Sequence, residues 1–96
     1  RIVGYIEHPV LKITVMQMNN RFVLKLEANM LEQTYKFHED DNLRTMADIE
    51  KLVDETFLNE CLKRFSDMKK VAVKRINGIF NKLKVNVKVN VSAKVF

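Results

Sequence analysis

The sequence is poor in the residues that interrupt regular structure, with two glycines, one proline and no tryptophan in 96 residues. It has no glycine-rich loop, which excludes the common phosphate-binding fingerprints of nucleotide-binding proteins. The single cysteine, Cys61, cannot form an internal disulfide, so we expect a reducing, cytoplasmic environment. No apolar run approaches the roughly 18 residues that a membrane-spanning helix needs, so we expect no membrane association.

What the sequence does contain is the composition of an ordered globular chain. Hydrophobic residues make up 47% of it, a content that is typical of a folded domain when glycine and proline are scarce. A chain of this length suits one hydrophobic core, so residues 1–96 are predicted to form a single domain. The first residues, RIVGYIEHP, lack the basic start, long apolar stretch and cleavage site of a signal peptide.

The net charge of +5 is distributed unevenly along the chain. Residues 1–37 carry a net charge of +2, residues 38–60 one of −6, and residues 61–96 one of +9. The chain is therefore polarised more than it is simply basic. This polarity favours contact between the acidic segment of one copy and the basic segment of another at low salt.

The first third of the chain has the alternating pattern of an antiparallel meander. Strands are predicted at Ile2–Ile6, Val10–Met18, Arg21–Ala28 and Leu31–Phe37. Asn19 and Asn20 form the expected turn between the second and third strands, because asparagine tolerates the positive φ angles of a tight hairpin. A two-residue turn fixes the register and places Val15 opposite Leu24 on the apolar face.

Helical patterning begins after the polar loop that ends at Asn42. Thr45 is the predicted N-cap of a short helix, and Asp48 follows it at the spacing of a capping box. The apolar residues that follow fall into two stripes, whose centres differ by roughly 145° around one continuous helix. A single straight helix would therefore have to bury opposite sides at its two ends, which predicts two helices.

The break between the two helices is expected between Glu55 and Phe57, with Thr56 as the cap of the second helix. The apolar stripe of this second helix comprises Leu58, Cys61, Leu62, Phe65, Met68, Ala72, Ile76 and Ile79. Its end, or the start of its fraying, is predicted at Asn77–Gly78, because glycine commonly terminates helices. The fold class predicted is α+β: a meander of three to four strands, a short helix, a long helix and a C-terminal strand.

The C-terminal strand is predicted from LKVNVKVNVSAKV, in which every odd position from 83 to 95 is apolar and every even one polar. Such a strand would be about 43 Å long, more than the meander strands can pair with. We expect residues 83–96 to join a sheet edge, through strand exchange or strand pairing across a two-fold dimer. The alternative is that the distal half is frayed. The side chains expected at the interface are Val85, Val87, Val89 and Val91.

No catalytic, cofactor or metal site is predicted. His38 stands beside three carboxylates, but they lack the ligand spacing of a zinc site and the spaced oxygens of an EF-hand, so we favour a solvated loop. His38 and Cys61 are conceivable as a base and a nucleophile. Cys61, however, falls on the apolar stripe of the predicted helix, where an inert core cysteine is the simpler interpretation.

Basic residues form the one signal that suggests a macromolecular ligand. They are Lys63, Arg64, Lys70, Lys74 and Arg75 of the second predicted helix, together with Lys84 and Lys88 of the tail. Such a cluster is compatible with an electrostatic footprint for nucleic acid. No recognisable nucleic-acid-binding motif accompanies it, and lysine on one face of an amphipathic helix is normally the solvated face. Nucleic-acid binding is therefore the alternative hypothesis.

Two stretches, GYIEHPVLKITVMQMNNRFVLKLEANMLEQTYKF and IEKLVDETFLNECLKRF, resemble a family of small uncharacterised proteins from Bacteroidales-type bacteria, over roughly residues 2–75. The resemblance implies a bacterial cytoplasmic protein and carries over no functional residues. The function that we expect is a small non-enzymatic binding or structural module that self-associates, as a dimer, without a cofactor or a small-molecule substrate.

Overall fold

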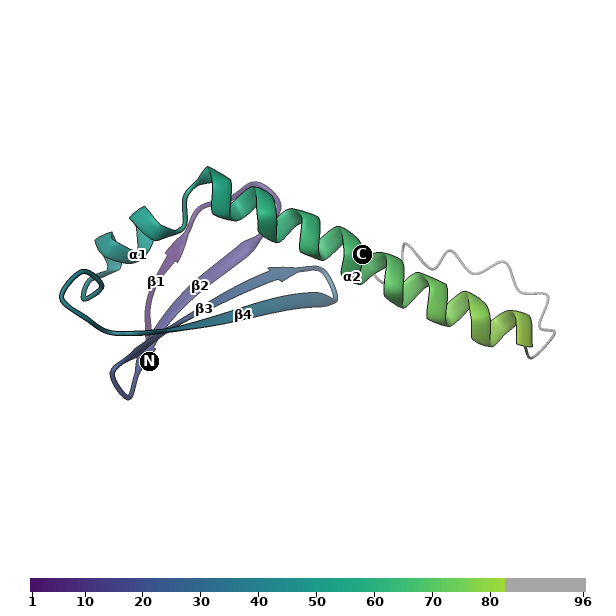
Figure 1. Cartoon of the computed structure of the whole chain (residues 1–96), viewed down its shortest axis with the longest axis horizontal. Coiled ribbons are helices and arrows are strands. Elements are labelled where there is room, and N and C mark those ends of the chain that lie inside the picture. Colours follow the sequence, from purple (N-terminus) through teal and green to yellow (C-terminus); the bar gives the residue numbers. More distant parts are fainter. Residues whose placement is uncertain (83–96) are drawn as a thin grey trace.

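The structure is a computed structural model that describes residues 1–82, and it contains a four-stranded sheet followed by two helices. The strands are β1 (Ile2–Ile6), β2 (Lys12–Met18), β3 (Arg21–Ala28) and β4 (Leu31–His38), and the helices are α1 (Met46–Leu52) and α2 (Glu55–Lys82). The strands are antiparallel in the order β1-β2-β3-β4 (Figure 1). This confirms the predicted α+β class and the meander. The predicted C-terminal strand, with its valines and with Lys84 and Lys88, lies outside the described residues.

The first long hairpin has the predicted turn and register. Asn19 and Asn20 have φ angles of 50° and 59°, the left-handed conformation that a tight hairpin turn requires. Val15 lies opposite Leu24, and both side chains point to the face that the helices cover. The sequence pattern was sufficient to predict this register, because a slip of one residue would turn every apolar side chain of β2 toward the other face of the sheet.

The start of β2 differs from the prediction. The strand begins at Lys12 rather than at Val10. The imidazole Nδ1 of His8 accepts hydrogen bonds from the backbone N–H groups of Val10 and Leu11, at 3.1 and 3.0 Å. These two residues are therefore held in a local turn by a side chain, and their N–H groups are not available to a strand ladder.

The second long hairpin turns at Asn29, whose φ angle is 55°. The register places Glu27 directly opposite Glu32 on the outer face of the sheet, the face away from the helices. Lys25 lies between the two carboxylates, with its Nζ 3.7 Å from Glu27 and 4.0 Å from Glu32. These exposed ion pairs add little stability by themselves, but they offset the repulsion of like charges in a facing pair.

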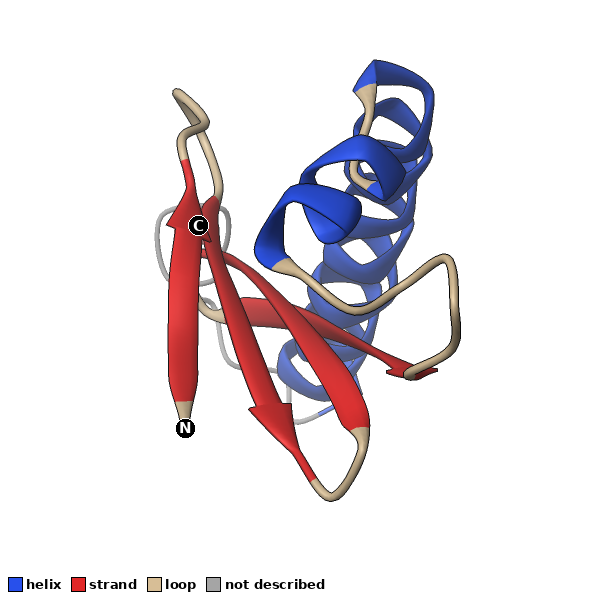
Figure 2. Ribbon diagram, turned by 90° about the vertical axis from the view of Figure 1, so that its left-hand side faces the viewer, coloured by secondary structure: helices blue, strands red, loops and turns tan. Residues whose placement is uncertain are grey.

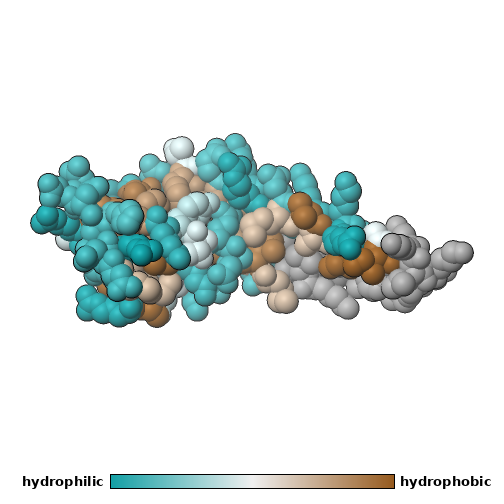
Figure 3. Space-filling model, turned by 60° about the horizontal axis from the view of Figure 1, so that its bottom comes forward, coloured by the Kyte–Doolittle hydropathy of each residue, from teal (hydrophilic) through white to brown (hydrophobic). Residues whose placement is uncertain are grey.

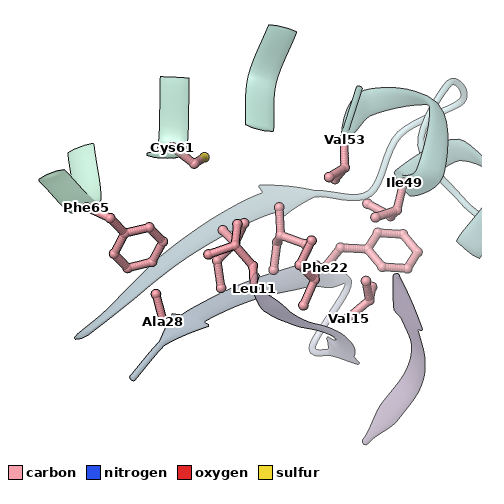
Figure 4. Packing of buried hydrophobic residues seen from close by; sticks show 11 residues of the cluster. Leu11, Val15, Phe22, Ala28, Ile49, Val53, Cys61 and Phe65 are labelled. Atoms are coloured by element: carbon pink, nitrogen blue, oxygen red, sulfur yellow. The ribbon is translucent and has the colours of Figure 1, made fainter. Parts of the chain in front are cut away.

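The hydrophobic core lies between the inner face of the sheet and the two helices, which cover the same side of it (Figure 2). Strand β3 supplies four buried side chains to this core, those of Phe22, Leu24, Leu26 and Ala28. Phe22 lies beside Ile49 of α1, and Phe65 points from α2 toward Ala28 (Figure 4). The predicted core face is thus confirmed.

The N-terminus of α1 carries the predicted capping box. The Thr45 hydroxyl accepts a hydrogen bond from the backbone N–H of Asp48 at 3.2 Å. In return, the Asp48 carboxylate accepts the backbone N–H groups of Arg44 and Thr45, at 2.8 and 3.0 Å. These backbone hydrogen bonds, that of Arg44 foremost, hold the pKa of the Asp48 carboxyl below its ordinary value.

The lowered pKa of Asp48 predicts an acid-dependent contribution to stability. Because the folded-state pKa is below the unfolded one, the contribution is present above the unfolded pKa and is lost as the pH falls through the folded pKa. Asp48→Asn keeps an acceptor oxygen but cannot titrate. We therefore expect the free energy of unfolding of the variant to fall less on acidification than that of the wild type. Urea unfolding measures it, from neutral pH down to pH values below the ordinary pKa range of aspartate. Equal slopes for both proteins would contradict this assignment.

The break between the two helices is real, but it lies earlier than predicted. α1 ends at Leu52 and α2 begins at Glu55, so the interruption falls at residues 53–54 rather than between Glu55 and Phe57. Asp54, not Thr56, is the cap, since its Oδ1 accepts the backbone N–H of Phe57 at 2.9 Å. From the position before the helix, its carboxylate reaches a free N–H group of the first turn.

Helix α2 is longer than predicted. It continues through Asn77 and Gly78 to Lys82, because Gly78 does not adopt the positive φ angle that ends a helix. At 1.5 Å per residue its 28 residues extend over about 42 Å. Among the described side chains of α2, those that the core takes run from Phe57 to Met68, and the rest of the described helix projects beyond the sheet (Figure 1).

Candidate self-association site

The projecting part of α2, residues 69–82, is here called the distal half of α2. At about 100° per residue, Ala72, Ile76 and Ile79 fall on the same side of the helix as Cys61 and Phe65. The apolar stripe that packs on the sheet thus continues in phase where the helix has passed the sheet. Ala72 and Ile76 are half-buried, and 41% of the Ile79 surface is exposed. Apolar side chains are visible at the surface along this part of the molecule (Figure 3).

The predicted basic residues of α2 are all exposed. Helical geometry places Lys63, Lys70 and Lys74 on the side opposite the apolar stripe, while Arg64 and Arg75 lie along one flank of it. The Lys63 Nζ is 3.5 Å from a carboxylate oxygen of Glu60, an exposed pair one turn apart. The distal half of α2 is therefore amphipathic, with one apolar and one cationic side.

The outer edge of β4 is a second candidate surface, since within residues 1–82 β4 has a neighbouring strand on one side only. The two-residue turn before Leu31 makes Ala28 and Leu31 a hydrogen-bonded pair, and bonded pairs then alternate along the ladder. The backbone groups of Glu32, Thr34 and Lys36 therefore point away from β3. Within residues 1–82 no hydrogen bond is made to these groups.

The inner face of the sheet is less well covered at β4 than at β3. The β4 side chains on this face, all half-buried, are Leu31, Gln33, Tyr35 and Phe37. Their partners across the ladder on β3, by contrast, are at least 93% buried. The apolar layer is thus incomplete along the same edge at which backbone groups are open.

A small polar network joins β4 to α2. Gln33 Nε2 donates to the backbone carbonyl of Cys61 at 2.8 Å, and the Tyr35 hydroxyl donates to Gln33 Oε1 at 2.6 Å. The Tyr35 ring also meets Phe57 edge-to-face, with ring centroids 5.3 Å apart. These contacts orient α2 on the sheet, and the alternation of β4 alone gave no signal for them.

Cys61 lies where the sequence placed it, on the apolar side of α2 and 1% exposed. Burial raises the pKa of its thiol, and burial likewise raises the pKa of the neighbouring Tyr35 hydroxyl. Both groups are therefore held in their neutral forms, which disfavours the thiolate that a nucleophile requires. His38 is exposed on the outer face of the sheet, so the structure does not bring it together with Cys61.

The acidic loop after β4 uses its side chains as local hydrogen-bond acceptors. Glu39 accepts a hydrogen bond from Gln17, and Asp41 pairs with Arg44 at 2.6 Å. An open hollow of about 540 Å³ lies beside this loop, with a polar lining that includes Asp40 and Arg44. Among residues 1–82, no group of three or more histidine, cysteine or carboxylate side chains is placed to hold a metal ion.

Comparisons with known proteins add no family to this description: no protein-family model, curated protein or solved structure matches the chain. The resemblance over roughly residues 2–75 therefore stays an expectation. Neither of the two described helices is long and apolar enough to cross a membrane.

Proposed function

We propose that this protein is a small non-enzymatic binding or structural module that self-associates, in the simplest case as a homodimer. The observation that carries the proposal is the continuation of the α2 apolar stripe beyond the core. Ala72, Ile76 and Ile79 keep the helical phase of the packed residues although the core takes no side chain from residues 69–79. A solvated helix has no need of this periodicity, whereas a helix that packs against a second chain does.

Covering this stripe contributes free energy to association. Moving an isoleucine side chain from full exposure to full burial contributes roughly 1.5–3 kcal/mol, and completing the burial of the partly exposed Ile76 and Ile79 contributes a fraction of that in each copy of a two-fold dimer. Charge favours antiparallel copies, because the net −6 of residues 38–60 then lies near the basic distal half of the partner. Such an arrangement predicts an association that weakens as salt is added.

The test is the oligomeric state of the full chain and of two matched variants. Ile76→Asp places a charge on the apolar stripe, while Asn77→Asp adds the same charge one residue away, on an exposed position. We expect Ile76→Asp to raise the dimer dissociation constant at least about tenfold, and Asn77→Asp to change it little. Sedimentation equilibrium measures both. A wild-type chain that is monomeric throughout the concentration range would refute the proposal, as would equal constants for both variants.

The alternative function is nucleic-acid binding through the cationic side of α2, supported by the exposure of Lys63, Lys70 and Lys74. We expect only weak binding, with dissociation constants for generic DNA and RNA no tighter than about micromolar at physiological salt. Fluorescence anisotropy with mixed-sequence oligonucleotides over a salt titration measures this. A sub-micromolar affinity that persists at about 200 mM salt would favour the alternative, because non-specific phosphate contacts weaken steeply with salt.

We also propose a cytoplasmic location. The support is the single cysteine, which the structure buries at Cys61 without a partner thiol in the sequence. A chain of this kind needs no oxidising compartment in order to fold.

A further inference from the structure

The open edge of β4 is better suited to receive a strand than the other edge of the sheet. β1 has five residues, and its register with β2 shifts between Ile2 and Gly4, an irregularity of the kind that protects sheet edges. β4 has eight residues in unbroken register with β3 and contains no proline. Its outward-facing backbone groups at Glu32, Thr34 and Lys36 form a regular row of donors and acceptors.

We propose that residues 83–96 of a second copy add to this edge as a fifth strand, next to β4. The inference rests on the proposed self-association and names the surface and the segment that take part in it. The segment is chosen because LKVNVKVNVSAKV is the remaining stretch of strict two-residue alternation in the chain. Of the two edge strands within residues 1–82, β4 has the longer and more regular row of outward-facing groups.

The length of chain between the sheet and the segment favours a second copy over the same subunit. From Phe65, the last buried residue of α2, to Lys82 the helix rises about 26 Å away from the core. An extended chain needs about eight residues to return over that distance, at roughly 3.3 Å per residue. Of the 14 residues that follow Lys82, only about six would then reach the edge of the same subunit. A second copy is free of this constraint.

Side-chain chemistry on both faces of β4 matches the alternation of the segment. Its odd positions, such as Val87 and Val89, extend the inner apolar layer beside the half-buried Tyr35 and complete it along this edge. Its even positions, such as Lys88, fall on the outer face, where the β4 side chains are polar and exposed. This face carries the carboxylate of Glu32 and the ammonium group of Lys36, so the favoured register places lysines of the segment beside Glu32. If the segment were turned over, its lysine side chains would lie against the inner apolar layer. The valine face of the segment is therefore the one that points inward.

Amide hydrogen exchange of the full chain tests the proposal without any substitution. The amides of Gln33 and Tyr35 bond to β3 and serve as internal controls, whereas those of Thr34 and Lys36 face the edge. We expect Thr34 and Lys36 to be protected at concentrations where sedimentation shows a dimer, and to lose this protection on dilution to the monomer. Gln33 and Tyr35 should stay protected throughout.

A pair of variants provides the second measurement. Thr34→Pro removes an N–H group that does not bond to β3, and proline is tolerated at such edge positions, while Thr34→Ala keeps the N–H group as the matched control. We expect the proline variant to raise the dimer dissociation constant at least about tenfold and the alanine variant to leave it within about twofold.

The outcomes separate this inference from the proposed function. A dimer whose Thr34 and Lys36 amides exchange freely would overturn the strand pairing and leave self-association standing. Edge protection that is independent of concentration in a monomer would mean that the segment of the same subunit occupies β4, which would overturn the role of the second copy. A chain that is monomeric with unprotected edge amides would refute both.

Discussion

Replacing Leu24 with alanine is expected to lower the free energy of unfolding by roughly 2–5 kcal/mol, and Phe65→Ala by a similar amount. Leu24 is fully buried in the centre of β3, and Phe65 is 3% exposed where α2 meets the sheet. Truncation at either position removes apolar contacts and leaves a cavity, which neighbouring side chains fill only in part. Chemical denaturation of both variants, followed by circular dichroism, measures the loss.

The matched control for these variants is Met30→Ala. Met30 is 77% exposed in the turn between β3 and β4, so the same kind of truncation should change stability by no more than about 0.5 kcal/mol. A loss below about 0.5 kcal/mol at both Leu24 and Phe65 would contradict the assignment of the core faces.

Deleting residues 83–96 is expected to convert the dimer into a monomer or an aggregate. The deletion removes the segment that we propose to cover the β4 edge, and an uncovered regular edge either stays solvated or pairs with other chains. Size-exclusion chromatography with light scattering separates these outcomes, and thermal unfolding reports any accompanying loss of stability. A truncated protein with the same oligomeric state and the same melting temperature would show that the segment has no role in association.

A scrambled segment is the control for the deletion. It keeps the length and the composition of residues 83–96 but breaks their two-residue alternation, so that valine and lysine side chains no longer separate onto two faces. We expect the scrambled chain to behave as the deletion does. If it dimerises like the wild type, the apolar stripe of α2 or general charge attraction, rather than strand pairing, holds the copies together.

Local patterns determined the parts of this fold that depend on residues close together in the sequence. The turn at Asn19 and Asn20 fixed the register of β2 and β3, because only a few residue types accept its backbone angles. Thr45 and Asp48 identified the start of α1 through their three-residue spacing. The apolar stripe of α2, which carries the proposed function, could likewise be read from its helical period.

Element boundaries were less predictable where a side chain from outside the element competes for backbone groups. His8 delays the start of β2, and Asp54 places the helix cap two residues earlier than predicted. Gly78 has the residue type of a helix end, yet α2 continues through it. In each case the sequence pattern predicts the element, but a single hydrogen bond or backbone angle decides where it begins or ends. The free energies of the alternative boundaries differ by only about 1 kcal/mol.

The sequence by itself thus determined the strands, their register, the helical faces and the residues of the core, because alternation, turns and caps act between neighbours in the chain. Only the tertiary structure decided that β4 is an edge of the described sheet, that Gln33 and Tyr35 join it to α2, and that α2 extends beyond the sheet. These properties depend on which elements lie side by side and where each one stops in space. Strand order and helix overlap follow from the packing of the whole chain, which no short window of the sequence contains.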